Sequence, residues 1–578
     1  MNDIAEFNLV GWDYFAFAAY FIVVCFVGFW VGRKKRTSSD EYFLAGHTLP
    51  WYIVGSSFIA SNISSEHFIG MIGAAYVYGI SIAQVSWGNI FSFTLLIWFF
   101  IPFLLAAKVF TTPEFLEKRF NPGLRQFFAI VTIISNVIAF LAAVLYGGGI
   151  ALQELFGWNL WFGIMAIGSI AGFLAIYGGL KSGAYADFFT VIIMLIAGLA
   201  VTILGLYMLS GESHSLIDGF KEMIVKNRAQ SGVWRQVVLD NAQNMVGKDN
   251  YNRLSVIQPV THPICPWPNL FLGVFTISIW YNVLNQFMIQ RVLGAKNMYH
   301  ARMGIVFAGY IQAFLPVIIV IPGMIMFAKY PEIMQLPWNE IRPEADKSYV
   351  AMLQLLIPAG LRGLFLAALF GAIQSTVTAV LNSTSTIVTL DIYKRMFNPH
   401  ASEKKLVRIG VWTSLIILII SIIMGRYIGL LGSGLFFYIQ AMYSFFAPPF
   451  AAIFLLGILF RRINGKGATV ALFTGFVLSI LLKIYISLCP GHPAWIESFR
   501  MQSIVVWAIC IVLCVVVSLM TKRPSPDKIT DDLTINWKKL NIFSQLGTKW
   551  YTSVILWWGL FAVVIFILMA VFSGFIFT

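Results

Sequence analysis

The stretch Ala60-Ser61-Asn62-Ile63-Ser64-Ser65-Glu66-His67-Phe68-Ile69-Gly70-Met71 places polar side chains in the middle of a long apolar segment. Its flanks, residues 51–55 and 72–76, are typical of a membrane-buried helix. Ionisable groups at bilayer depth are rare and usually line a bundle interior or a wet cavity. The stretch therefore predicts a pathway for a solute or an ion. The alternative interpretation is a packed helix whose small residues let neighbouring helices approach.

The composition places the chain among polytopic membrane proteins. It has 578 residues, of which 59% are hydrophobic and 11% charged, and its mean hydropathy is +0.81. Apolar runs recur from end to end, which favours a single membrane domain over residues 1–578. The net charge of +14 does not indicate nucleic-acid binding, because Lys and Arg gather in short loops at helix ends, where they signal topology.

We expect an all-α protein with about fourteen transmembrane helices, found as windows of about 20 apolar residues. The expected spans are 12–32, 50–78, 80–107, 125–155, 158–179, 186–210, 268–293, 302–329, 360–390, 404–425, 428–460, 466–488, 500–520 and 552–577. Alternate threading puts the basic loops on one side, the cytoplasmic side, and both termini outside. The first span is followed by Arg33-Lys34-Lys35-Arg36, so it is a retained helix and not a cleaved signal.

Two of these spans are expected to be irregular. The span 50–78 is predicted to unwind near Asn62 to Ser65, because serine, glycine and asparagine weaken a helix. The span 428–460 begins Gly432-Ser433-Gly434 and contains Pro448-Pro449, so it is predicted to kink or break. Broken helices in separated parts of a chain are typical of inverted-repeat transporters.

Two further spans carry polar residues at membrane depth. The span 268–293 has the serine, aromatic and amide side chains Ser278, Trp280, Tyr281, Asn282, Asn285 and Gln286. These groups suit a polyhydroxylated ligand, although amides also join helices. The span 360–390 has hydroxyls at Ser375, Thr376 and Thr378. Neutral oxygens suit a Na⁺ site, although such hydroxyls also bond within their own helix.

Asp187 follows a glycine-rich turn, Tyr177 to Ala186, and stands near the expected start of a helix. An acid in that position complements the helix dipole, and it also suits an ion pathway. Both interpretations remain open. The five cysteines have no metal-binding spacing, and the sequence leaves open whether Cys265 and Cys489, in outer loops, form a disulfide.

Several ordered motifs resemble those of the solute:sodium symporter family, and within it those of the sodium/glucose and bacterial sodium/galactose cotransporters. They are Asp40 to Gly46, Ser61 to Gly70, Pro113-Glu114-Phe115, Gln290-Arg291 and Leu381-Asn382-Ser383-Thr384. The resemblance implies a LeuT-type 5+5 inverted-repeat core. Its parts would be a leading helix at 12–32, five-helix repeats at 50–210 and 268–460, and three C-terminal helices at 466–577.

The resemblance also implies the positions of the binding sites. A sodium site would use the carbonyl groups of Ala60, Ile63 and Ala372 with the hydroxyls of Ser375 and Thr376, and a second sodium would involve Asp187 and Thr378. The substrate positions would be Asn62, His67, Ser86, Asn89, Ser278, Tyr281, Gln312 and Gln440, and Met71 and Phe436 would cover the pocket as gate residues.

Two positions depart from the family pattern. Ser86 falls where the sugar carriers typically have Glu, and Gln312 falls where they typically have Lys. The changes remove a charged acceptor and a charged donor for substrate hydroxyls. Both changes leave neutral polar groups, so a sugar or sugar-like polyol is expected. An anionic substrate gains no cationic partner among these positions.

The expected function is Na⁺-coupled symport of a sugar or polyol into the cell by alternating access. The alternative is a Na⁺-coupled symporter of a non-sugar organic solute. An enzyme is not expected, because no catalytic cluster accompanies Glu66 and His67, which point in different directions on a regular helix. Na⁺ is the expected coupling ion, without a cofactor. The substrate, Na⁺ and membrane lipid are the expected partners, without nucleic acid, in a plasma membrane or bacterial inner membrane that the chain crosses many times.

Overall fold

The computed structural model describes residues 9–33, 38–107, 109–228, 252–428, 435–536, 542–574 and 576. These residues form helices joined by turns, and no strand occurs among them beyond two isolated bridges. The all-α class predicted from the sequence is confirmed. The start of the expected span 428–460, with Gly432, Ser433 and Gly434, lies outside the described residues.

The helices of the first half of the chain begin and end as follows: α1 Gly11–Gly32, α2 Ser39–Phe43, α3 Trp51–Asn62, η2 Glu66–Met71, α4 Ile72–Tyr78, η3 Gly79–Ala83, α5 Gln84–Trp87, α6 Asn89–Leu95, η4 Leu96–Phe100, α7 Ile101–Ala107, α8 Thr112–Arg119, α9 Pro122–Ile134, η5 Ser135–Leu141, α10 Ala142–Phe156, α11 Leu160–Leu209 and α12 Leu216–Asn227. Those of the second half are α14 Trp267–Leu272, η7 Gly273–Phe275, α15 Ile277–Ile279, η8 Trp280–Leu284, α16 Gln286–Leu293, α17 Met298–Lys329, α18 Trp338–Ala345, α19 Ser348–Leu356, α20 Arg362–Ile387, η10 Val388–Phe397, α21 Glu403–Gly425, α22 Leu435–Leu459, α23 Gly465–Leu488, α24 Phe499–Met520 and α25 Val554–Val571.

Twelve helical segments of the described chain are long and apolar enough to cross a membrane, and a bent pair, Trp267–Leu284 with Gln286–Leu293, makes a thirteenth. One of the twelve, Glu66–Ala107, joins the second half of one expected span to the whole of the next. Gly79, at φ 67°, separates the two. When Glu66–Ala107 is divided into two spans at this residue, the described chain has the expected fourteen candidate membrane spans.

The break predicted near Asn62 is present. Helix α3 ends at Asn62, and Ile63 is extended at φ −81° and ψ 120°. The chain resumes as the π-helical turn η2 and then as α4. Because the helix stops there, the carbonyl groups of its last turn lack partners within the helix. They are available to a neighbouring helix or an ion.

The second break lies where the sequence analysis did not place it. The bent pair turns by 54° at Asn285, which is extended at φ −68° and ψ 122°. Helix α22, by contrast, continues without a break through Pro448 and Pro449. Of the predicted kink or break at these prolines, the break does not occur. Neighbouring helices can satisfy the backbone groups that proline frees inside a membrane bundle.

The expected turn before Asp187 is almost absent. Helix α11 is interrupted only at Gly179, with φ 56° and ψ −167°, and is helical on both sides of it. Asp187 therefore lies two turns beyond the interruption. The helix-dipole interpretation was wrong, because the dipole effect fades within the first turn.

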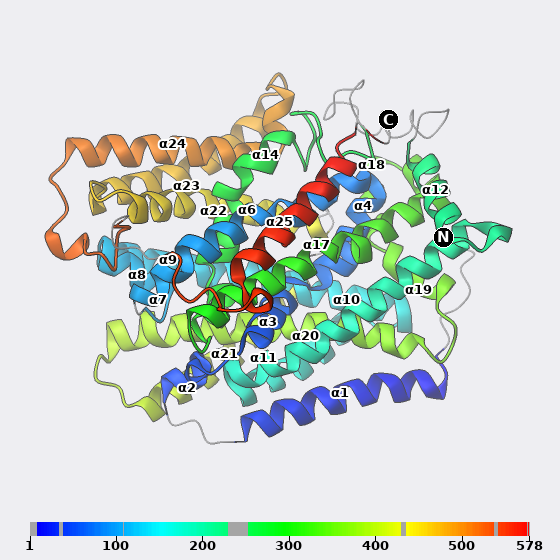
Figure 1. The fold of residues 1–578 in the computed structure, drawn as a ribbon, viewed down its shortest axis with the longest axis horizontal. Coiled ribbons are helices and arrows are strands. Elements are labelled where there is room, and N and C mark those ends of the chain that lie inside the picture. The colour runs from blue at the N-terminus through cyan, green and yellow to red at the C-terminus, as the bar shows by residue number, and fades with distance from the viewer. Residues whose placement is uncertain are drawn as a thin grey trace.

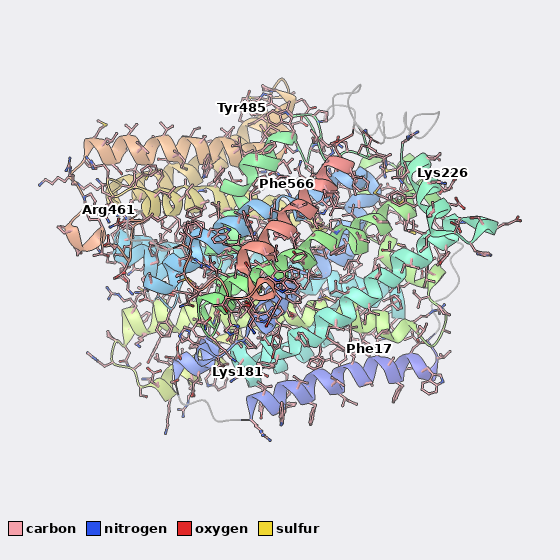
Figure 2. All side chains as sticks on the ribbon, in the orientation of Figure 1. Phe17, Lys181, Lys226, Arg461, Tyr485 and Phe566 are labelled. Carbon is pink, nitrogen blue, oxygen red and sulfur yellow. The ribbon has the colours of Figure 1, made fainter. Side chains whose placement is uncertain are left out.

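The two ends of the chain lie on one side of the bundle. Figure 1 shows the ends marked N and C beside α12 and α18, with α2 and α8 at the opposite end. Asp13 at the start of α1 accepts a hydrogen bond from Gly360, and Phe572 after α25 accepts one from Val256. Lys226 and Arg461 also mark the two opposite ends in Figure 2.

The end that carries α8 holds a network of ion pairs. Glu117 on α8 contacts Arg395 on η10 at 2.6 Å and Arg125 on α9 at 2.6 Å. Arg125 also contacts the buried Asp391 at 2.7 Å.

Cys265, which is buried, and Cys489, which is exposed, are both free thiols. A disulfide between them is not formed.

Candidate functional site

A polar cavity lies beside the first break, and the part of the bent pair that precedes the second break forms one of its walls. It is lined by Asn62, Glu66, His67, Met71, Gln84, Val85, Gly88, Asn89, Asn269, Leu270, Gly273, Ile277, Ser278, Tyr281, Gln312, Gln440, Tyr443 and Arg500. These residues come from the broken ends of the first interrupted helix, from α5, α6 and the start of the bent pair, and from α17, α22 and α24. Polar groups at this depth are stable when they line a cavity.

Most of the predicted substrate positions meet in this cavity. The residues that line it are Asn62, His67, Asn89, Ser278, Tyr281, Gln312 and Gln440, together with the predicted gate residue Met71. Ser86 is buried outside the lining, with no hydrogen-bond partner for its hydroxyl. Phe436 is also outside the lining and packs against Gly70, where an added Cβ would lie 2.7 Å from its backbone nitrogen.

Hydrogen bonds and aromatic rings define the walls. Asn62 donates to the Gln312 amide oxygen at 3.0 Å. The rings of Tyr281 and Trp280 both lie 5.3 Å from the ring of Tyr443. An aromatic face beside amides and hydroxyls suits a molecule with both C–H faces and hydroxyl groups.

Two ionisable residues of the lining, Glu66 and Arg500, are not among the predicted substrate positions. Glu66 lines the same cavity as its neighbour His67, because both begin the helical segment that resumes after the break. Arg500, at the start of α24, also lines the cavity. The predicted substrate positions themselves offer no cationic partner, but this neighbouring helix supplies a guanidinium. One signal could have identified Arg500, since an arginine at the outer end of a span departs from the positive-inside rule.

The predicted sodium site gathers neutral oxygens at the first break. The Thr376 hydroxyl on α20 donates to the Ile63 carbonyl at 3.3 Å and the Ser61 carbonyl at 3.4 Å. The Ser375 hydroxyl is fully buried and has no hydrogen-bond partner. Carbonyls released by an interrupted helix, together with hydroxyls, form a donor set that fits Na⁺.

Asp187 lies near this site but already has partners. One of its oxygens accepts a hydrogen bond from Ser57 at 2.6 Å and lies 3.9 Å from Arg291 Nη2. Arg291 Nε in turn donates to Ser57 Oγ at 2.7 Å. The other Asp187 oxygen and the Thr378 hydroxyl are buried without hydrogen bonds. Arg291 thus supplies a positive charge where a second sodium was expected.

An all-helical membrane bundle with two interrupted helices around a polar cavity defines a secondary transporter of the LeuT type. The sequence pattern of the family described as "Sodium:solute symporter family" matches residues 42–475. The chain belongs to this family, and its relatives are cotransporters and not enzymes.

Two relatives are similar to this chain over most of its length. The "Sodium/glucose cotransporter" of Vibrio parahaemolyticus is 31% identical over 556 residues, 94% of this chain and 97% of that protein. The human "Sodium/myo-inositol cotransporter" is 30% identical over 552 residues, 91% of this chain and 75% of that protein. A solved structure of a Na⁺-coupled sialic acid symporter matches with a TM-score of 0.73 at 18% identity, covering 90% of this chain and all of that one. At that identity the likeness concerns the fold.

Proposed function

We propose that this protein carries a neutral sugar or polyol across the membrane together with Na⁺, by alternating access. The observation that supports this most is the pairing of the polar cavity with the oxygen-rich break at Ile63, which Thr376 contacts. The relatives named for glucose and myo-inositol point to the same class of substrate. The protein would lie in the membrane as a multi-pass carrier.

Na⁺ would be held by the carbonyls of Ala60, Ile63 and Ala372 and by the hydroxyls of Ser375 and Thr376. Bound there, it would tie α3 to α20. Since α3 also supplies Asn62 to the cavity, an ion at the break would fix one wall of the substrate site. Release of the ion into a low-sodium interior would loosen that wall.

We assign one Na⁺ to the cycle. Arg291 compensates the charge of Asp187, so a second cation at Asp187 and Thr378 would have to displace it. A membrane potential of 100 mV contributes ~2.3 kcal/mol for each charge moved inward. One ion is therefore enough to drive accumulation of a neutral solute.

The test is uptake into proteoliposomes of labelled D-galactose, D-glucose and myo-inositol, each with an inward Na⁺ gradient and with K⁺ in its place. Accumulation of one of them only with Na⁺ is expected. The ratio of labelled sodium to labelled solute should be one. Failure of all three to accumulate, with the protein folded by its melting profile, would contradict the proposed substrate class.

A further inference from the structure

Two opposite charges face the substrate cavity. Glu66 is 2% exposed and Arg500 is 5% exposed, and both line the cavity. No other described residue of the lining is an aspartate, glutamate, lysine or arginine. A buried charge is costly unless it is paired or hydrogen-bonded. Burying Glu66 and Arg500 here therefore carries a considerable desolvation penalty.

Gln440 connects the two charges. Its amide nitrogen donates to Glu66 Oε1 at 2.9 Å, and its amide oxygen accepts from Arg500 Nη2 at 3.2 Å. Each end of the amide thus has the partner that its chemistry requires. The side chain of Gln440 is held in one orientation, with the carboxylate on one side and the guanidinium on the other.

Arg500 has unused hydrogen-bonding capacity. Its Nε is buried and has no partner, and its guanidinium carbon lies 5.8 Å from the ring of Phe499, which is an aromatic and not a polar contact. A guanidinium has five N–H donors in a fixed plane. A donor left without a partner at such a depth is unfavourable by itself, and a ligand oxygen would satisfy it.

The residue comes from outside the predicted repeats. Helix α24 packs against α22, which carries Gln440, and Figure 1 shows it at the margin of the bundle. Arg500 is the second residue of α24 and reaches inward from its first turn. The predicted substrate positions all lie in spans 50–107, 268–329 and 428–460, so this helix adds a contact that the repeats do not supply.

We propose that Glu66 and Arg500 are the charged acceptor and the charged donor for the hydroxyl groups of the substrate, and that Gln440 holds them apart in a fixed geometry. The inference rests on the proposed function and specifies its substrate class. The substrate is a neutral molecule with several hydroxyl groups, because an anion bound to the guanidinium would lie beside the carboxylate. A carboxylate and a guanidinium each form charge-assisted hydrogen bonds, which are stronger than neutral ones.

The first test separates binding from turnover. Sodium-driven uptake of the solute that the wild type accumulates is measured with Arg500→Gln, Arg500→Lys and Glu66→Gln. Loss of a charge-assisted hydrogen bond is expected to raise KM by about 10- to 100-fold. Vmax should stay within about twofold of the wild type, because a residue that binds the ground state and the transition state equally affects KM alone. Arg500→Lys keeps the charge but loses the planar fork, and an intermediate KM is expected. Met501→Leu, the next residue on α24 and absent from the lining, is the control with unchanged KM.

The second test uses the substrate to locate the contact. The monodeoxy analogues of the accumulated solute compete with the labelled parent in the wild type and in Arg500→Gln. In the wild type, one analogue should bind more weakly than the parent solute. In Arg500→Gln the same analogue should bind as well as the parent does, because the hydroxyl and its donor are then both missing. A merely structural role of Arg500 would weaken every analogue by the same factor.

The third measurement concerns charge. Galacturonate should compete at least tenfold more weakly than galactose in the wild type, and Glu66→Gln should narrow that difference. Galacturonate binding more tightly than galactose would overturn the inference, and so would unchanged KM values in both Arg500→Gln and Glu66→Gln. In those cases sodium-dependent uptake by the wild type still stands. Absence of uptake by the wild type itself is the separate failure of the proposed function.

Discussion

The Thr376 hydroxyl lies 3.3 Å from the carbonyl oxygen of Ile63, and it joins helix α20 to the break after α3. Both residues are buried, at 0% and 1% exposed. The contact connects two helices that belong to different predicted repeats, 313 residues apart in the chain. A side chain in this position can respond to an ion and transmit its presence to the cavity wall.

Thr376→Ala removes a proposed sodium ligand. We expect the Na⁺ concentration for half-maximal uptake to rise about tenfold, the equivalent of about 1.4 kcal/mol, with little change in solute KM at saturating Na⁺. Thr376→Ser keeps the hydroxyl and should remain within about threefold of the wild type, allowing for the lost methyl group. Sodium activation curves in proteoliposomes measure both, and an unchanged curve for Thr376→Ala would remove this residue from the site.

Asp187→Asn leaves Arg291 without its acidic partner. Breaking a buried pair from one side costs roughly 3–5 kcal/mol, so the melting temperature of the detergent-solubilised protein should fall clearly. Replacing both partners, as Asp187→Asn with Arg291→Met, should recover part of the loss because no unpaired charge then remains. Equal melting temperatures for the single variant and the wild type would show that the 3.9 Å contact does not stabilise the fold.

Asn285→Ala favours a continuous helix at the second break. Both amide atoms of Asn285 are buried without partners, and alanine is the better helix former. We expect a melting temperature equal to or above that of the wild type together with a several-fold lower Vmax, since hinge positions control turnover. Asn285→Gly also removes the amide but does not favour the helix. It should retain most of the transport rate, and equal losses in both variants would argue against a hinge.

The ion pairs of Glu117 give a stability that depends on pH. The hydrogen bond from Arg395, and then that from Arg125, lower the pKa of Glu117 from 4.5 to about 2, against the opposing effect of burial. Because the pKa is lower in the folded state, the stabilisation is fully present above about pH 4.5 and is lost as the pH falls toward 2. This pKa shift corresponds to about 3 kcal/mol of folding stability. Because Arg395 is half exposed and water screens the ion pair, the expected contribution is about 1–2 kcal/mol.

Glu117→Gln should therefore melt below the wild type at pH 7, and the difference between the two proteins should shrink as the pH is lowered through 4. Differential scanning fluorimetry over that range measures it. A difference that stays constant from pH 7 to pH 3 would show that the charge of Glu117 is not the source of the stabilisation.

The interrupted helix at Asn62 to Ser65 could be predicted because its cause is local. Serine, glycine and asparagine weaken a membrane helix wherever they cluster. The hydroxyl groups of Ser375 and Thr376 could also be recognised from the sequence, because they are neighbours in an otherwise apolar span. The break at Asn285 was missed because Pro448 and Pro449 gave a stronger local signal, whereas the surrounding helices satisfy the backbone of α22 and leave it continuous.

By itself, the sequence determined the all-helical membrane class and the family, and it named seven residues that the structure places in the lining of one cavity. Apolar runs and ordered motifs are local features of the sequence, so they can be recognised without knowing how the helices pack. Only the tertiary structure decided that Arg291 pairs with Asp187 and that Arg500 reaches Gln440. These contacts join residues 104 and 60 positions apart, and packing between helices alone decides which of their charged groups meet.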